Sequence, residues 1–236
     1  MLETPEWVSK WFNRSYEVYL SQSHNTLELE KIQSLTGQMP HYESLKDSKT
    51  LPSVAMLKLN GGLGSSMGCV GPKSLIQCCS DGRSFLDVIV QQVQSDSMID
   101  RFILLNSFNT SKETRYHLSN HHPDFDWIEL MQYPFKKINA QTNQPFVDDS
   151  AVNYNPPGHG SVYFDLYHSG ILQQLMDDGV HYLFISNADN LAAVCDEKIA
   201  SYLHSNKVPF LIELTPKLDM DKKGGTVIAY DGDPKL

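Results

Sequence analysis

Two kinds of segment are missing from this sequence of 236 residues. No apolar run approaches the roughly 20 residues that a membrane-spanning helix needs. The N-terminus, Met1 to Glu6, lacks the basic segment followed by an apolar one that marks a secretory signal. The sequence therefore predicts a cytoplasmic protein without a membrane partner.

Cysteine is also scarce. The four cysteines are Cys69, Cys78, Cys79 and Cys195, and they lack the paired spacing of a zinc site. Cys78 and Cys79 are adjacent in the sequence, and two adjacent cysteines are not spaced to bind the same ion in a tetrahedral site. We expect free, buried thiols in a reducing compartment.

Positive charge is in short supply as well. There are 19 basic against 28 acidic side chains, which gives a net charge of −9. This balance argues against nucleic acid or an anionic membrane as a partner. With 41% apolar residues, the chain can bury a sizeable core, which predicts one large domain with a small appendage.

Glycine, in contrast, is concentrated in one short segment. Glycines stand at positions 61, 62, 64, 68 and 71, directly after an apolar run, and Lys73 follows them. Glycine lets backbone N–H groups approach an anion closely, and lysine adds a point charge. This glycine loop, residues 61–72, therefore predicts a site for phosphate groups.

Three other interpretations of the glycine loop explain it less well. In a Walker-type loop, glycine directly precedes lysine, but Pro72 separates Gly71 from Lys73 and Ser66 occupies the first glycine position. A dinucleotide fingerprint runs straight into a helix, which Gly71-Pro72 would interrupt. A surface turn without a ligand would explain one or two glycines, but not five glycines with a lysine.

The rest of the chain alternates short apolar strands with helices. Expected strands are 54–59, 102–106, 127–131, 182–186, 210–214 and 226–230; expected helices are 84–94, 111–119, 164–176 and 196–205. This alternation predicts an α/β fold with a mostly parallel, Rossmann-like sheet covered by helices on both faces. Ligands bind beyond the carboxyl ends of such strands, where the glycine loop, the segment after Met131 and residues 187–190 would meet.

An N-terminal helical arm, residues 1–50, is expected before a nucleotide-binding part, residues 51–236. Pro5 marks a helix start, and Trp7, Trp11 and Val18 follow at helical intervals. A second, polar helix is expected over 27–35. We expect the two tryptophans to pack against the protein and not to bind a ligand.

Residues 57–74, LKLNGGLGSSMGCVGPKS, resemble the nucleotide-binding loop of the UTP–glucose-1-phosphate uridylyltransferases, also called UDP-glucose pyrophosphorylases. Four further motifs of that family recur in order, at 156–160, 186–191, 215–217 and 223–226. The resemblance implies a fold of the nucleotide-diphospho-sugar transferase type. It also implies Mg²⁺-dependent, in-line transfer from UTP to glucose-1-phosphate, giving UDP-glucose and pyrophosphate without a covalent intermediate.

The resemblance assigns roles to individual residues. Lys73 would be the catalytic residue that meets the triphosphate, and Asp189 would ligate Mg²⁺. The nucleotide-binding residues would be Leu59, Asn60, Gly61, Gly62, Gln132 and Gly158, and the sugar-phosphate-binding residues His159, Asn187, Asp189 and Gly225.

Several of these residues have structural alternatives. Asp189 or Asn190 could cap a turn ahead of Leu191, and Gly225 could simply form a tight entry into the last strand. The segment around Gln132 departs from the family, because its proline, Pro134, comes early and Lys136 occupies the usual proline position. Other polar residues are expected on solvated loops and not as metal ligands: His121, His122, Asp148 and Asp149.

The resemblance covers residues 51 to the end, whereas family members continue with a second phosphate-binding lysine and a C-terminal β-helix domain. We therefore expect the N-terminal part of a catalytic domain. A sheet without its late strands would leave an open edge, which favours association into a homo-oligomer. Two alternatives stay open: a UTP-binding fragment without turnover, and a pyrophosphorylase for another sugar-1-phosphate.

Overall fold

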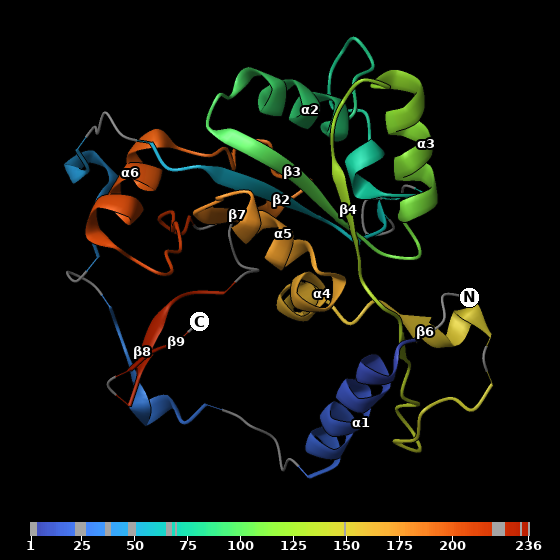
Figure 1. The fold of residues 1–236 in the computed structure, drawn as a ribbon. Coiled ribbons are helices and arrows are strands. Elements are labelled where there is room, and N and C mark those ends of the chain that lie inside the picture. The colour runs from blue at the N-terminus through green and yellow to red at the C-terminus, as the bar shows by residue number, and fades with distance from the viewer. Residues whose placement is uncertain are drawn as a thin grey trace.

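The computed structural model describes residues 4–21, 27–35, 39–46, 51–64, 68, 70–148, 150–218, 225–231 and 233–235. Among these residues, four parallel strands form a central sheet in the order β4-β3-β2-β7 (Figure 1). The strands are β2 (Val54–Asn60), β3 (Ile99–Asn106), β4 (Ile128–Met131) and β7 (Tyr182–Asn187). The expected parallel α/β fold is confirmed.

Strand β2 lies in the middle of this sheet because it is apolar on both faces. Leu57 is fully buried and pairs with Ile103 on one side and Ile185 on the other. Near-continuous apolar strands are typical of parallel sheets that are covered on both faces. Two cores result, one on each face of the sheet.

Helices from different parts of the chain cover these faces (Figure 1). The helices α4 (Val162–Ser169) and α5 (Ile171–Asp177) contribute to one core, and α2 (Phe85–Ser95) and α3 (Ser111–His121) to the other. The helix α6 (Glu197–Asn206) packs through Ala200 against Val54 at the start of β2. The expected single helix over 164–176 is two helices, because Gly170 adopts a φ of 80° between them.

The N-terminal helix α1 (Glu6–Ser21) is held by aromatic contacts. Trp7 stacks on His168 with ring centroids 4.0 Å apart, and Trp11 stacks on Phe164 at 4.4 Å. The expectation that these tryptophans pack is confirmed. The helix expected over 27–35 is wrong: a 3-10 turn (Leu29–Lys31) leads into β1 (Ile32–Gln33).

The late strands also differ from expectation. Residues 210–214 form no strand, because an extended segment becomes a strand only when a neighbour completes its hydrogen bonds. The last expected strand is shortened to β8 (Ile228–Tyr230), which pairs antiparallel with β1 and β9 (Asp233–Lys235) outside the central sheet.

Smaller elements complete the described part. A two-stranded ribbon joins β5 (Phe135–Lys136) and β6 (Tyr154–Asn155), and further 3-10 turns are Tyr42–Ser44, Lys73–Leu75, Ala151–Asn153 and His159–Ser161.

Cys78 is an exposed free thiol and Cys79 and Cys195 are partly exposed, so the expected burial is wrong for them. Within the described ranges, every helix is too short or too polar to cross a membrane.

Candidate functional site

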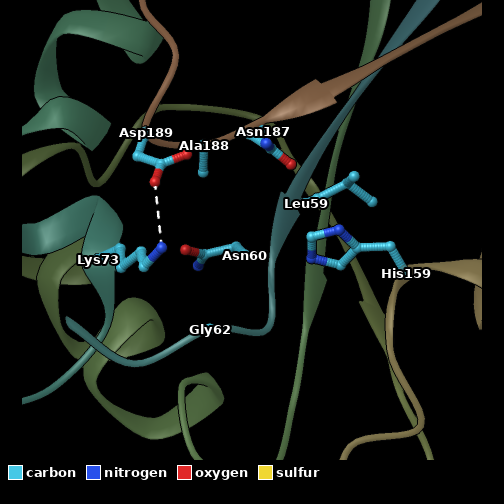
Figure 2. Close-up of a pocket in the computed structure, with 8 residues that line it drawn as sticks. All are labelled: Leu59, Asn60, Gly62, Lys73, His159, Asn187, Ala188 and Asp189. Atoms are coloured by element: carbon cyan, nitrogen blue, oxygen red, sulfur yellow. Dashed lines mark hydrogen bonds and ion pairs between the residues drawn. The ribbon is translucent and has the colours of Figure 1, made fainter. Parts of the chain in front are cut away.

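A pocket lies at the carboxyl ends of β2 and β7 (Figure 2). It brings together side chains that are far apart in the sequence: Leu59, Asn60, Gly62, Lys73, His159, Asn187, Ala188 and Asp189. Most of the residues that the sequence singled out therefore meet at one place. Its position at the ends of parallel strands is where α/β sheets bind ligands.

The described ends of the glycine loop are hydrogen-bonded to each other next to the end of β2. Gly64 N–H donates to the carbonyl of Gly71 at 2.9 Å, and Lys73 N–H donates to the carbonyl of Gly62 at 3.2 Å. Gly71 has a φ of 101°, which side chains rarely allow. The loop thus places Lys73 at the pocket.

The opposite wall of the pocket is the end of β7. Ala188 N–H donates to the carbonyl of Leu59 at 3.2 Å, which fixes the next residue, Asp189, beside the pocket. The Asp189 carboxylate lies 3.4 Å from the Lys73 ammonium, and each side chain is about one third exposed (34% for Lys73 and 31% for Asp189). Two opposite charges therefore face each other in a solvent-accessible pocket.

The turn after β7 is made by Asn190 and not by Asp189. The Asn190 side-chain oxygen accepts a hydrogen bond from Ala192 N–H at 3.2 Å. Of the two candidates for a capping turn, the structure uses Asn190. The Asp189 carboxylate is left to face Lys73.

Asn60 brings an unsatisfied acceptor to the pocket. Its side chain is buried, and its Nδ2 donates to Asn106 Oδ1 at 2.7 Å and to Thr114 Oγ1 at 3.0 Å. Its Oδ1 has no hydrogen-bond partner among the described residues, and Figure 2 shows it on the side of Lys73. Leaving a buried acceptor unpaired costs about 1–3 kcal/mol, so a ligand that donates a hydrogen bond here would be favoured.

His159 completes the pocket from a third segment. The preceding Gly158 has a φ of 101° and begins the short turn that carries the histidine. Although the residue is open to solvent, desolvation of the ring lowers the pKa of His159 below its usual value; the Asp189 carboxylate opposes this effect and Lys73 adds to it. The neutral imidazole is therefore favoured, and it can both donate and accept hydrogen bonds.

Gln132 does not line the pocket but is hydrogen-bonded to Gly158 and Ser161, on either side of His159. It is 1% exposed, and its Nε2 donates to the carbonyl of Gly158 at 2.8 Å and to Ser161 Oγ at 3.0 Å. A Cβ atom on Gly61 would lie 2.2 Å from Gln132 Oε1. Gly61, Gln132 and Gly158 thus form a packed layer next to the residues that line the pocket.

Among the polar residues expected on solvated loops, the two histidines are placed differently from expectation. His121 is an exposed residue of α3, whereas His122 is partly buried and hydrogen-bonds to Asp87, so neither lies on a solvated loop. Asp148 is exposed on a loop, as expected, and accepts a hydrogen bond from Asn153 Nδ2 at 2.6 Å. Exposed Gly225 does not line the pocket, and Cys69, Asp149 and Gly224 lie outside the described residues.

Sequence reasoning missed one residue that supports the site. Lys58, in β2, is fully buried, and its Nζ donates to the carbonyl of Ala193 at 2.7 Å. Burial lowers the pKa of Lys58 to about 8. The sequence contained a signal for Lys58, because it is the single charged residue in the apolar run 54–59. Lys58 ties β2 to the segment that follows Asp189.

A parallel sheet with a glycine loop, a lysine and a carboxylate at its carboxyl edge defines an α/β protein of the class that binds phosphorylated ligands. The comparison with known sequences makes this more specific. The chain belongs to the UTP–glucose-1-phosphate uridylyltransferase family, whose sequence model matches residues 9–236. We expected the similarity to begin at residue 51, but it begins earlier, within α1.

Individual relatives agree with this assignment. The UTP–glucose-1-phosphate uridylyltransferase of Encephalitozoon cuniculi is 39% identical over 236 residues, covering 95% of this chain and 47% of the relative. A probable enzyme of the same name from Schizosaccharomyces pombe is 42% identical over 194 residues, covering 79% and 38%. The chain spans about half the length of these relatives.

The fold is also shared with solved structures. A mutant of UDP-glucose pyrophosphorylase from Leishmania major, in complex with UDP-glucose, matches with a TM-score of 0.85 and 34% identity. The match covers 96% of this chain and 49% of that chain. A UDP-glucose phosphorylase from Trypanosoma brucei matches with a TM-score of 0.84 and 33% identity, covering 98% and 52%.

Proposed function

We propose that this chain binds UTP and glucose-1-phosphate at the pocket and transfers the uridylyl group to give UDP-glucose and pyrophosphate. The observation that carries the proposal is the facing pair of Lys73 and Asp189, 3.4 Å apart beside the glycine loop. The names of the relatives, and UDP-glucose in the Leishmania major structure, support the choice of substrates.

The chemistry is an in-line displacement at the α-phosphorus of UTP. A phosphate oxygen of glucose-1-phosphate forms the new bond to that phosphorus, while the bond to pyrophosphate breaks and its electron pair leaves with pyrophosphate. Two anions must approach each other, so the protein's task is positioning and charge neutralisation. Lys73 would neutralise the triphosphate, with the backbone N–H groups of the glycine loop around it.

The residues around Asp189 are compatible with Mg²⁺. This ion prefers one or two carboxylates together with phosphate oxygens and water, and Asp189 presents one accessible carboxylate at the pocket. Asp189 would hold the ion, which when bound would neutralise charge on the phosphates. Lys73 would then exchange its contact with Asp189 for a phosphate oxygen.

The other residues of the site would orient the substrates. The unpaired Oδ1 of Asn60 would accept a hydrogen bond from the nucleotide, and the backbone of Leu59, Gly61 and Gly62 would lie against it. His159 and Asn187, which line the pocket, would donate to the sugar phosphate.

Gln132 and Gly158 would recognise the uracil base. Any direct contact of Gln132 with the base would use Oε1, because Nε2 already donates to Gly158 and Ser161. Gly158 would reach the base through its backbone, held in place by that hydrogen bond.

The experiment measures UTP affinity by calorimetry in the presence of Mg²⁺, for the wild type and for Lys73→Ala. Loss of a charge-assisted contact, worth about 1.5–3 kcal/mol, predicts a roughly 10- to 150-fold weaker affinity. Lys112→Ala, which removes an exposed lysine on α3, is the matched control and should bind as the wild type does. Unchanged affinity in Lys73→Ala would overturn the proposal.

Pyrophosphate release with glucose-1-phosphate then separates the alternatives. Release that depends on Lys73 supports the transferase, whereas UTP binding without release identifies a binding fragment. Faster release with galactose-1-phosphate or an N-acetylhexosamine-1-phosphate would assign another sugar, because a site that hydrogen-bonds hydroxyl groups discriminates strongly between them.

A further inference from the structure

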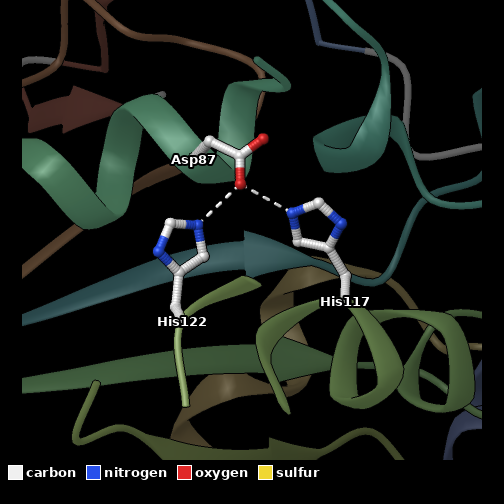
Figure 3. A group of neighbouring side chains, drawn as sticks. All are labelled: Asp87, His117 and His122. Atoms are coloured by element: carbon white, nitrogen blue, oxygen red, sulfur yellow. Dashed lines mark hydrogen bonds and ion pairs between the residues drawn. The ribbon is translucent and has the colours of Figure 1, made fainter. Parts of the chain in front are cut away.

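A second cluster of polar side chains lies outside the pocket, between α2 and α3 (Figure 3). Asp87 stands in the first turn of α2, His117 lies in α3, and His122 directly follows α3. One nitrogen of each imidazole and one carboxylate oxygen lie within 4.8 Å of one another. None of the three side chains lines the pocket described above.

The three side chains converge on one point. His117 Nε2 lies 2.7 Å and His122 Nε2 lies 2.6 Å from the same oxygen, Oδ1 of Asp87. Their side chains are partly exposed, at 17%, 23% and 13% for His117, His122 and Asp87. An ion and a water molecule can therefore reach them from solvent.

The carboxylate is held in place from behind. Asp87 Oδ2 accepts hydrogen bonds from the backbone N–H and from the hydroxyl of Ser84, both at 2.7 Å. Hydrogen bonds of this kind orient metal-binding carboxylates and raise the affinity of a site. Asp87 Oδ1 is thereby directed at the two imidazoles.

The two helices are also fixed independently of the cluster. Leu86, next to Asp87, and Leu118, next to His117, are both buried in the same apolar core. The backbone positions of Asp87 and His117 are therefore set by core packing, and His122 N–H donates to the carbonyl of buried Leu118 at 2.8 Å. Preorganised ligands of this kind bind an ion without having to order the chain first.

We infer that Asp87, His117 and His122 form a binding site for Zn²⁺, with water in the fourth position. Two imidazole nitrogens and one carboxylate are a donor set that suits Zn²⁺, whereas Mg²⁺ prefers oxygen ligands alone. At metal–ligand distances of roughly 2.0–2.1 Å, tetrahedral ligand atoms lie about 3.3 Å apart. Small side-chain rotations that open the two contacts to Asp87 by about 0.6–0.7 Å, and bring the two nitrogens, now within 4.8 Å of each other, to a similar separation, would accommodate the ion.

In the alternative state no metal is bound, and the two imidazoles are hydrogen-bonded to Asp87. In hydrogen bonds to Asp87 each Nε2 carries hydrogen, whereas a metal ligand must present its lone pair there. The two states exclude each other, so a metal titration distinguishes them directly.

The test titrates metal-free protein with Zn²⁺ in the presence of excess Mg²⁺ and measures bound zinc per chain. One equivalent should bind. His117→Gln and His122→Gln should each weaken binding by at least about 100-fold, because losing only an outer hydrogen-bond partner typically costs about 10–100-fold. No bound equivalent in the wild type, or unchanged binding in both variants, overturns the site.

Two controls exclude other zinc ligands. His121→Gln removes a neighbouring imidazole, with its ring centroid 4.5 Å from that of His117, and should leave binding unchanged. The double variant Cys78→Ser with Cys79→Ser removes two adjacent thiols and should also bind one equivalent.

A measurement on the wild type keeps the test valid if a variant fails to fold. Histidine ring signals in NMR spectra should show two imidazoles changing on addition of one equivalent of Zn²⁺, and the visible spectrum with Co²⁺ should report nitrogen and oxygen ligands. Unchanged ring signals overturn the site. Because no readout involves UTP, failure here is separate from failure of the proposed transferase function.

Discussion

At the scale of single residues, two neighbouring glycines differ in how closely their surroundings constrain them. A side chain on Gly61 would meet Gln132 Oε1 at 2.2 Å, whereas a side chain on Gly62 would have no atom within 4 Å. Gln132 cannot move away freely, because it is buried and donates to Gly158 and Ser161. Gly61 therefore allows close packing against Gln132, while Gly62 is free of that constraint.

Gly61→Ala should lower the free energy of unfolding by about 1–3 kcal/mol, the usual cost of overpacking a well-filled site. Gly62→Ala is the matched control and should change it much less. Urea denaturation of both variants measures the difference. Equal losses would show that the contact with Gln132 is not the cause.

Asp165 provides a second test at this scale. Its carboxyl group is 1% exposed, and burial raises the pKa of Asp165 to about 6, with Ser161 acting in the opposite direction. The unfolded chain titrates near 3.9, so the folded state loses stability as the pH rises from about 4 to 6. Above that range the loss amounts to about 3 kcal/mol.

Asp165→Asn should therefore match the wild type near pH 4 and be more stable at pH 7.5. Thermal unfolding at both pH values measures this, with exposed Asp124→Asn as the control. A variant that is less stable at pH 7.5 would contradict the argument.

The residues of the pocket could be named from the sequence because their motifs are local. Lys73 and Asp189 stand 116 positions apart, and the rule that ligands bind at the carboxyl ends of strands brought them together. Lys58 was missed although a single lysine in an apolar strand is a local signal. The cluster around Asp87 was missed, with His122 expected not to bind metal, because its three residues meet only in the folded chain. The binding roles of the pocket residues remain predictions.

At the scale of elements, α2 shows how strongly a helix start is specified. Ser84 Oγ accepts from Asp87 N–H, and the Asp87 carboxylate accepts from Ser84 N–H, which forms a reciprocal capping box. Such caps satisfy backbone donors that otherwise have no partner in the helix.

Ser84→Ala should destabilise the protein by about 1 kcal/mol, the typical value for an N-cap serine. Ser95→Ala is a control at the other end of α2, where the exposed hydroxyl donates to the carbonyl of Gln91. Thermal unfolding should show the loss for Ser84 alone. A loss of similar size for Ser95 would rule out capping as the explanation.

Strands that are marked by a local apolar run were predicted well, and elements that depend on a particular partner were not. The strands β2, β3, β4 and β7 were recognised because each is a short apolar run. The segment 210–214 is also mainly apolar but has no pairing strand among the residues that the structure describes. The segment 27–35 has helical spacing, but its residues are exposed or only partly buried. Composition alone does not supply the partner in either case.

At the scale of the whole molecule, one edge of the central sheet is formed by β7 within the described residues. Apolar side chains of the segment 210–214 are also open to solvent, with Phe210 62% and Leu214 46% exposed. Apolar surface of this kind favours association with other chains. Homo-oligomer formation, a cytoplasmic location and a domain boundary near residue 50 remain predictions.

Sedimentation velocity should show self-association that increases with concentration. The double variant Phe210→Glu with Leu214→Glu should reduce it, because charge opposes burial of that surface. Val147→Glu, at a side chain that is 92% exposed elsewhere, should not. A wild-type chain that stays monomeric at all concentrations would contradict this prediction.

The contact between Lys73 and Asp189 has a further consequence for how ligands enter. Each group occupies the position that a ligand would take on the other: Asp189 stands where a phosphate would meet Lys73, and Lys73 stands where a cation would meet Asp189. A phosphate that binds Lys73 would release the carboxylate for the proposed Mg²⁺, and Mg²⁺ on Asp189 would release the ammonium for phosphate. By thermodynamic linkage, nucleotide and ion would then raise each other's affinity by the same factor.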